Sequence, residues 1–292
     1  MKKQKASNTA QTVAYNRALG NLSPTVPGYS DSMAERFLSN SWKKRFEKGR
    51  SKLPGSPYPF RFRGMGICNQ FRTVMLDRSI LAAYPFEQLV ILGAGFDGRA
   101  WRLSGIENTI VFEVDHPNTQ LMKQEKTAQY KPAVKEVRFV EIDFTRNNLT
   151  TSLMNAGYKP EKKTFWLWEA VIMYLTPGEV FDTLTSISNC SAAGSSIAFT
   201  YMEKRNGKIP TSIFLKLLGE PVRSAYTTNE IAEVIKKCGW NLIDDTGIED
   251  WKRKLTPDLH LKRRNVGIQW NERILIGKRQ LVHGKNKLCI VY

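Results

Sequence analysis

The stretch that decides the fold is Gln88-Leu-Val-Ile-Leu-Gly-Ala-Gly-Phe-Asp-Gly-Arg99, with Glu113-Val-Asp115 at the end of the next apolar run. The apolar residues predict a buried strand that stops at Gly93-Ala94-Gly95, and glycines at such a turn let a ligand approach the backbone closely. Asp115 follows Gly93 by about twenty positions, where an acidic side chain can accept hydrogen bonds from a ribose diol. The stretch therefore predicts an α/β domain that binds an adenosine-containing ligand.

Short apolar runs alternate with helical stretches from residue 88 onward. Strands are predicted at 88–92, 109–115, 137–142, 164–168 and 195–201, and helices near 117–130, 146–156 and 177–190. This alternation is typical of parallel strands covered by helices on both faces. Two further runs, 240–243 and 273–277, are predicted to close the sheet, whereas the segment 251–266 carries too many charges for the core.

The 292 residues are predicted to form one domain with four parts. Residues 1–70 contain many turn formers and are expected to form a helical cap, and a helix over 72–84 leads into the first strand. The ligand-binding core covers 71–201. A substrate-side insertion that includes a sixth strand covers 202–265, and a closing strand and tail cover 266–292.

A net charge of +17 is the most unusual bulk property of the chain. Its basic residues are scattered and form no run of five, which favours a solvated surface over a nucleic-acid partner. The four cysteines and three histidines show no C-x-x-C or H-E-x-x-H spacing, so neither a disulfide framework nor a metal site is predicted. No apolar run is long enough for a membrane span or a signal peptide, and we expect a soluble, cytoplasmic protein.

The turn Gly93-x-Gly95-x-x-Gly98 also matches a dinucleotide fingerprint, so an NAD-dependent oxidoreductase is one interpretation. Asp97 argues against it, because a carboxylate inside the loop repels a pyrophosphate. S-adenosylmethionine has no phosphate and carries a sulfonium and an ammonium, which carboxylates attract. The sequence therefore favours S-adenosylmethionine over NAD.

Acidic residues follow four successive predicted strands, at the edge where ligands bind in open α/β sheets. Asp115 is expected at the ribose, Asp143 near the adenine, and Asp97 or Glu169 toward the methionine portion. Two of these positions have a simpler interpretation, since Asp97 can cap a helix and Asp143 can form a turn. Glu113 is expected to be structural and to point to the opposite side from Asp115.

Several motifs together resemble the leucine carboxyl methyltransferase family, over roughly residues 68–280. They are Arg72-Thr-x-x-x-Asp77, Ile91–Leu103, Val111–Pro117 and Glu169–Pro177. The family includes eukaryotic phosphatase-methylating enzymes and bacterial polyketide-type O-methyltransferases. The resemblance implies the Rossmann-like class I methyltransferase fold: a seven-stranded, mostly parallel sheet with an antiparallel last strand, a helical N-terminal cap and an insertion after strand five.

The resemblance also implies roles for single residues. It suggests Arg72 for the carboxylate of the donor and Glu169 for its amine. It places Gly93, Ala94 and Gly95 at the close backbone approach, Asp115 at the ribose, and Asp143 and Phe144 around the adenine. The chain departs from the family at Gly98, where the family usually has Thr.

The activity implied is S-adenosylmethionine-dependent O-methylation of a small molecule, with S-adenosylhomocysteine as product. A carboxylate acceptor is already ionised and needs no general base, whereas a hydroxyl needs one, for which Tyr174 and Tyr201 are candidates. Arg223 and Tyr226 are candidate substrate residues. A nucleic-acid methyltransferase is an alternative that the segment Glu169-Ala-Val-Ile172 disfavours, since enzymes that methylate base amines place an Asn/Asp-Pro-Pro-aromatic motif there. A non-catalytic S-adenosylmethionine-binding protein is the other alternative.

Overall fold

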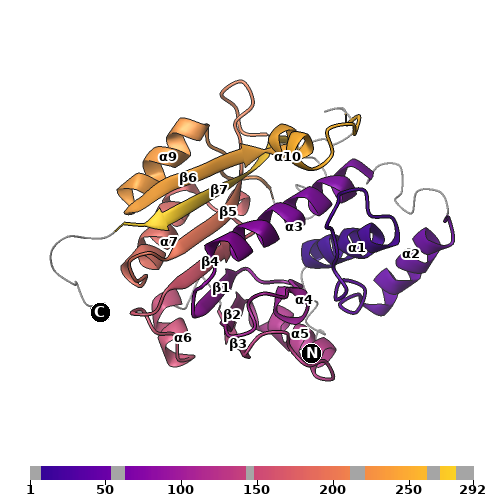
Figure 1. Cartoon of the computed structure of the whole chain (residues 1–292), viewed down its shortest axis with the longest axis horizontal. Helices are drawn as coiled ribbons and strands as arrows, with labels where there is room; N and C mark the ends of the chain where they lie inside the picture. Colours follow the sequence, from indigo (N-terminus) through magenta and orange to yellow (C-terminus); the bar gives the residue numbers. More distant parts are fainter. Residues whose placement is uncertain (1–7, 54–62, 143–147, 211–220, 262–269, 281–292) are drawn as a thin grey trace.

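Seven strands form one mixed sheet in the computed structural model, which describes residues 8–53, 63–142, 148–210, 221–261 and 270–280 (Figure 1). Their order is β3-β2-β1-β4-β5-β7-β6, in which β1 to β5 are parallel and β7 is antiparallel to β5 and to β6. The strands are β1 (Gln88–Leu92), β2 (Ile110–Asp115), β3 (Glu136–Glu141), β4 (Thr164–Trp168), β5 (Ser196–Met202), β6 (Trp240–Gly247) and β7 (Glu272–Arg279). The predicted fold class, with its antiparallel last strand, is confirmed.

The strand order reverses direction between β1 and β4. From β1 the chain moves outward through β2 to β3, and it then crosses back to β4 on the other side of β1. The loops that follow β1 and β4 therefore leave in opposite directions and flank a crevice at the carboxyl edge of the sheet. The glycine turn after β1 and Glu169 after β4 are placed side by side by this topology.

Helices cover both faces of the sheet. One face packs against α3 (Arg63–Ala83), α4 (Arg99–Arg102) and α10 (Ile248–Leu255). The other packs against α6 (Leu149–Asn155), α7 (Pro177–Asn189) and α9 (Thr228–Lys237). A capping box begins α9, in which Thr227 and Glu230 each accept a hydrogen bond from the other's backbone N–H.

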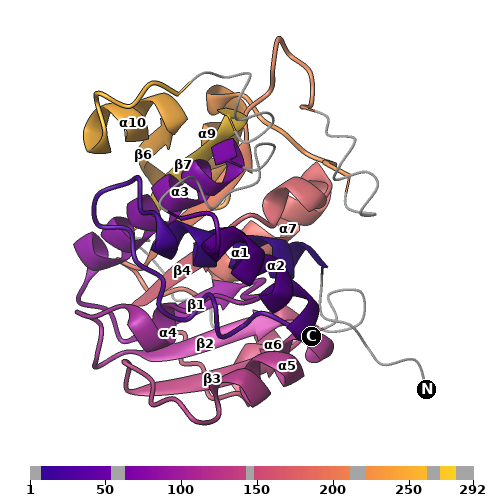
Figure 2. The same cartoon turned by 90° about the vertical axis from the view of Figure 1, so that its right-hand side faces the viewer.

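The N-terminal helices α1 (Asn8–Leu22) and α2 (Asn40–Arg50) form a separate layer beside α3 (Figures 1 and 2). They share an apolar cluster with Phe96 of the loop after β1, and α1 packs along α3. The cap is thus helical as expected. The boundary expected at residue 70 falls inside α3, however, because the apolar stripe of that helix already begins at Ile67.

The expectation that the charged segment 251–266 lies outside the core is wrong for its first part. In α10 the side chains of Ile248, Trp251 and Leu255 share one face and are buried, and the Trp251 Nε1–H donates to Thr246 Oγ1 at 3.0 Å. The charges at 252–254 lie on the other face, as in any amphipathic helix. None of the described helices combines the length and apolarity that a membrane crossing requires.

Candidate active site

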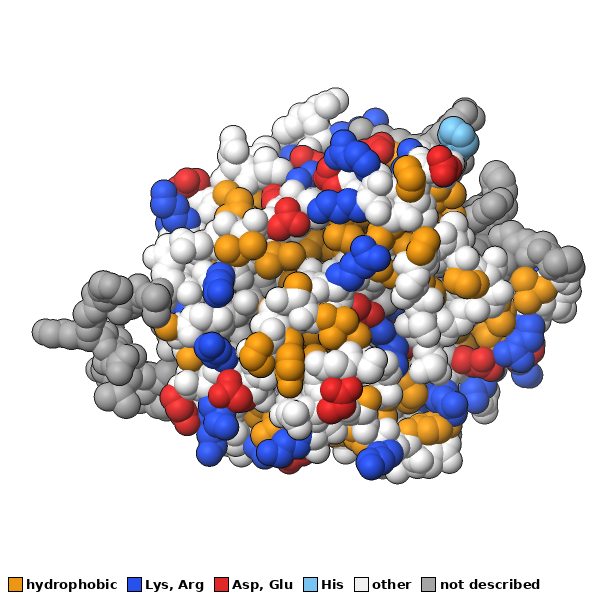
Figure 3. Space-filling view, in the orientation of Figure 1, with side chains coloured by type: hydrophobic (Ala, Val, Ile, Leu, Met, Phe, Trp, Pro, Cys, Tyr) orange, Lys and Arg blue, Asp and Glu red, His pale blue; other side chains and the backbone are white. Residues whose placement is uncertain are grey.

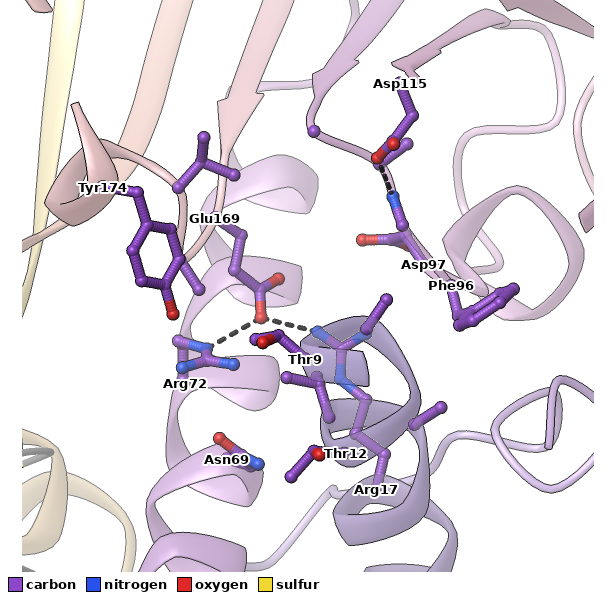
Figure 4. Close-up of a pocket in the computed structure, with 18 of the residues that line it drawn as sticks. Thr9, Thr12, Arg17, Asn69, Arg72, Phe96, Asp97, Asp115, Glu169 and Tyr174 are labelled. Carbon is purple, nitrogen blue, oxygen red and sulfur yellow. Dashed lines mark hydrogen bonds and ion pairs between the residues drawn. The ribbon is translucent and has the colours of Figure 1, made fainter. Parts of the chain in front are cut away.

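A cavity of about 440 Å³ lies at the carboxyl edge of the sheet, between the strand ends, α1 and α3 (Figure 4). Its walls come from the turn after β1, from Asp115 at the end of β2, from residues 169–174 after β4, and from the inner sides of the two helices. Its volume falls in the range of small-molecule and cofactor sites. Gly93, Ala94, Gly95, Asp97, Asp115, Glu169 and Arg72, all predicted from the sequence, line this one cavity.

The glycine turn needs its glycines for two different reasons. Gly93 has φ +63°, and a Cβ built on it would lie 2.5 Å from Val171 Cγ2, so neither the conformation nor the space suits a side chain. Gly95 has φ +46°, and its N–H donates to Asp115 Oδ2 at 2.6 Å. The second carboxylate oxygen, Oδ1, accepts from the backbone N–H of His116 at 2.7 Å. Asp115 is therefore fixed directly beside the turn, at the cavity wall.

Glu169 is the centre of an arginine cluster. Its Oε1 accepts from Arg17 at 2.5 Å and from Arg72 Nε at 2.8 Å (Figure 4). Its Oε2 accepts from Arg99 at 2.8 Å. Burial alone would raise the pKa of Glu169, but the three guanidinium groups lower it well below its usual range. The next residue, Ala170, has φ +57° and donates its N–H to Thr200 Oγ1 at 2.7 Å, which holds this strained turn in place.

Arg72 joins the cluster to the closing strand. Its second contact is with Glu272 at the start of β7, whose two oxygens both lie 2.9 Å from Arg72 Nη1. Arg102, Asp31 and Asp77 extend the cluster away from the cavity. In total, the four arginines 17, 72, 99 and 102 face the five carboxylates 31, 77, 97, 169 and 272, which leaves a net charge of −1.

Asp97 caps helix α4 and also lines the cavity. Its Oδ1 accepts from the backbone N–H of Arg99, the first residue of α4, and its Oδ2 pairs with the Arg99 guanidinium. Burial raises the pKa of Asp97, but Arg99 and Arg17 lower it further, so the group is ionised. Asp97 is therefore negatively charged, as the argument against a pyrophosphate ligand requires.

Glu113 is structural, as expected, and it forms a fully buried ion pair with Lys123 of α5 (Pro117–Thr127) at 2.5 Å. Burial raises the pKa of Glu113 to about 7 in spite of the lysine. The expectation that it points to the opposite side from Asp115 is wrong, because residues two apart in a strand share a face.

The departure from the family at Gly98 has a steric cause in the cap. A Cβ on Gly98 would lie 2.8 Å from Met33 Cβ and 2.9 Å from Asp31 Oδ1. The cap segment thus occupies the space that a threonine side chain would need.

The remaining candidates divide between the cavity and other places. Tyr174 is half-buried and lines the cavity. Tyr201 is not among the lining residues; its hydroxyl donates to Asp245 at 2.7 Å, and burial and this hydrogen bond raise its pKa further, so it is a poor base. Arg223 is half-exposed beside Glu179, and Tyr226 is buried under another surface. The structure brings neither of these two to the cavity, and Asp143 and Phe144 lie outside the described residues.

Arg17 is the site residue that sequence reasoning missed. It is 4% exposed, comes from α1 and contacts Glu169, which lies 152 positions later. No motif or spacing marks it, since the contact exists only because α1 folds over the carboxyl edge of the sheet. The burial of this arginine is visible only in three dimensions.

Fold and site together define an α/β protein with a class I methyltransferase sheet and an acidic cavity at its switch point. A family model described as leucine carboxyl methyltransferase matches residues 10–188. The chain belongs to this family, and it is a methyltransferase.

Individual relatives agree with this assignment. The chain is 27% identical over 240 residues to YktD of Bacillus subtilis, whose name places it among S-adenosyl-L-methionine-dependent methyltransferases; the match covers 79% of this chain and 75% of YktD. A Mycolicibacterium smegmatis protein with the same type of name is 33% identical over 208 residues, covering 68% and 67%. A Thermobifida fusca crystal structure described as a methyltransferase shares the fold, with a TM-score of 0.55 at 16% identity over 95% of this chain and 96% of that one.

Proposed function

We propose that this protein transfers the methyl group of S-adenosylmethionine to an oxygen of a small molecule, either a carboxylate or a hydroxyl. S-adenosylmethionine is the methyl donor of the enzyme. The observation that carries the proposal is the charge of the cavity, which is negative by two units. Its charged lining residues are Arg17 and Arg72 against Asp97, Asp115, Glu169 and Glu272. The donor bears a sulfonium and an ammonium against one carboxylate and is positive by one unit.

The donor fits the residues that line the cavity. Asp115, fixed by two backbone N–H groups, is proposed to bind the ribose diol. Arg72 is proposed to bind the carboxylate of the methionine portion, and Glu169 the ammonium, so that each would exchange part of its present ion pair for a group of opposite charge on the donor. Asp143 and Phe144 remain proposals for the adenine.

When bound, the donor supplies a methyl group activated by its sulfonium. The protein then has to align the acceptor with that methyl and keep water away. The inner side of α1 closes the cavity opposite the strand ends, and Arg17 ties this helix to Glu169. A carboxylate acceptor would need no base, whereas a hydroxyl acceptor would use Tyr174, the one of the two predicted tyrosines that lines the cavity.

The proposal of a small acceptor is supported by the surface as well as by the cavity. On the face seen in Figure 3, lysines and arginines are spread among acidic and apolar side chains rather than gathered in one patch. A nucleic-acid methyltransferase would present a basic stripe to the phosphate backbone. The cavity beneath α1 instead suits a small molecule that binds entirely inside it.

The test has a binding arm and a transfer arm. Calorimetry should show micromolar affinity, in order of magnitude, for S-adenosylmethionine and S-adenosylhomocysteine and none for NAD. The protein is then incubated with donor carrying a labelled methyl group, in one reaction with a bacterial metabolite extract and in another with RNA and DNA. Label in an extractable small molecule, released by alkaline hydrolysis if it is an ester, supports the proposal; label in nucleic acid only would overturn it.

A further inference from the structure

Asn69 of α3 is a buried amide that lines the cavity and has no partner. Its exposed fraction is 3%, and among the described residues its side chain makes no hydrogen bond. Figure 4 shows it on the same helix as Arg72, with its amide in the space between α3 and α1. An amide that faces a cavity and makes no hydrogen bond to the described residues can bind a polar group of a ligand there.

A second buried asparagine shows the ordinary situation. Asn16 of α1 is 1% exposed, and its Nδ2–H donates to Thr12 O at 2.9 Å. Its Nδ2 also lies 3.5 Å from Met65 Sδ, so this nitrogen is hydrogen-bonded within the protein. Asn69 differs because the cavity, and not the protein, faces its donor and acceptor atoms.

The position of Asn69 along α3 relates it to the donor. Met65, Asn69 and Arg72 are spaced by four and then three residues, so they share one face of the helix, and all three line the cavity. Arg72 is the residue proposed for the methionine carboxylate. Asn69 lies about one turn from Arg72 toward Met65, so with the donor bound as proposed it would lie beyond the methionine portion, where an acceptor can bind.

Part of the cavity lining is apolar and adaptable. Met65 of α3, Met173 after β4 and Met202 at the end of β5 all contribute to the lining. Methionine side chains are flexible and fit irregular apolar ligands. The charged groups of the cavity wall, in contrast, are engaged with one another in the cluster around Glu169.

We propose that Asn69 orients the methyl acceptor, an apolar molecule whose hydroxyl or carboxyl oxygen binds the Asn69 amide while its body packs on the three methionines. The amide suits both groups, because it donates through Nδ2–H and accepts through Oδ1. This proposal rests on the methyl transfer proposed above. It adds a specificity residue that no donor contact requires.

The test compares Asn69→Leu with Asn16→Leu in the full chain, since leucine is close to asparagine in shape and lacks its polar atoms. The melting temperature of Asn69→Leu should stay within about 1 °C of the parent or rise, because no hydrogen bond within the described residues is lost. Asn16→Leu should melt about 2–6 °C lower, because it removes the hydrogen bonds that Asn16 Nδ2 donates to Thr12 O and to Met65 Sδ. The affinity of Asn69→Leu for S-adenosylhomocysteine should remain within twofold of the parent.

Transfer to the extract compounds that the parent protein labels should fall at least tenfold in Asn69→Leu, and Asn69→Gln should recover part of it. Undiminished transfer by Asn69→Leu, weaker binding of S-adenosylhomocysteine, or a loss of stability like that of Asn16→Leu would each overturn the role of Asn69. If the parent protein labels no compound although it binds S-adenosylhomocysteine, the proposed function fails. The stability and affinity comparisons then decide whether Asn69 is structural or is kept for a ligand.

Discussion

Replacing Glu169 by Gln should destabilise the fold strongly and weaken donor binding. Glutamine has the same shape, but it removes the charge that faces three guanidinium groups, whose arginines are 0–5% exposed. Where Oε2 now accepts from Arg99, an amide N–H would face another donor. Removing one charged partner from a buried ionic cluster lowers the free energy of unfolding by about 3–5 kcal/mol, because the remaining charges stay buried without compensation.

The matched control is Glu35→Gln. Glu35 also contacts an arginine, Arg50, at 3.0 Å, but both side chains are nearly half exposed. Water screens such a pair, so its loss should change stability by less than about 1 kcal/mol. Urea unfolding measures both free energies, and calorimetry with S-adenosylhomocysteine should show at least tenfold weaker binding for Glu169→Gln only. Equal stability of the two variants, or unchanged affinity of Glu169→Gln, would refute the reasoning.

Three further predictions concern the turn and the buried pair. Asp115→Asn should weaken S-adenosylhomocysteine binding at least tenfold by calorimetry, because its amide would direct a donor at one of two backbone N–H groups; full affinity would show that the ribose lies elsewhere. Gly93→Ala should lower the free energy of unfolding by about 1–3 kcal/mol, and Val171→Ala should restore part of it, since the new Cβ meets Val171; no rescue would contradict the clash. Burial raises the pKa of Glu113 from its usual value near 4.5 to about 7, so its contribution to stability is complete below pH 4.5 and is lost as the pH rises through 7. The double variant Glu113→Gln with Lys123→Met should flatten urea midpoints between pH 5 and 7.5, and an unchanged pH slope would contradict this assignment.

The sequence was sufficient to predict strands where the local apolar pattern and the burial of the residues agree. The strands at 88–92 and 164–168 have the predicted bounds, because each consists of one polar and four apolar residues that are all buried. The charged segment around Trp251 was misjudged, since counting charges over sixteen residues hides an apolar face with helical spacing. Because Asp97, Asp115 and Glu169 follow parallel strands, their meeting at one edge of the sheet could be predicted from the sequence. Nothing in the sequence predicted that Arg17, from a distant helix, pairs with Glu169, because that contact depends on how the cap packs.

Reintroducing the family residue by Gly98→Thr should destabilise this protein. Gly98 has φ −101° and ψ 0°, which threonine can adopt, so no backbone penalty is expected. The cost comes from Met33 and Asp31, which lie within 2.9 Å of the new Cβ and are buried to at least 96%. Overpacking of this kind costs about 1–3 kcal/mol.

Gly178→Ala is the control for Gly98→Thr, because a Cβ at residue 178 meets nothing within 4 Å and should leave stability unchanged or slightly higher. Asp31 also faces Arg17 and Arg102, so displacing it disturbs the same cluster that holds Glu169. Donor affinity should therefore fall together with stability in Gly98→Thr. A variant as stable as the parent in urea unfolding would mean that the cap can move away from the glycine turn, and that α1 and the donor loop are not one packed unit.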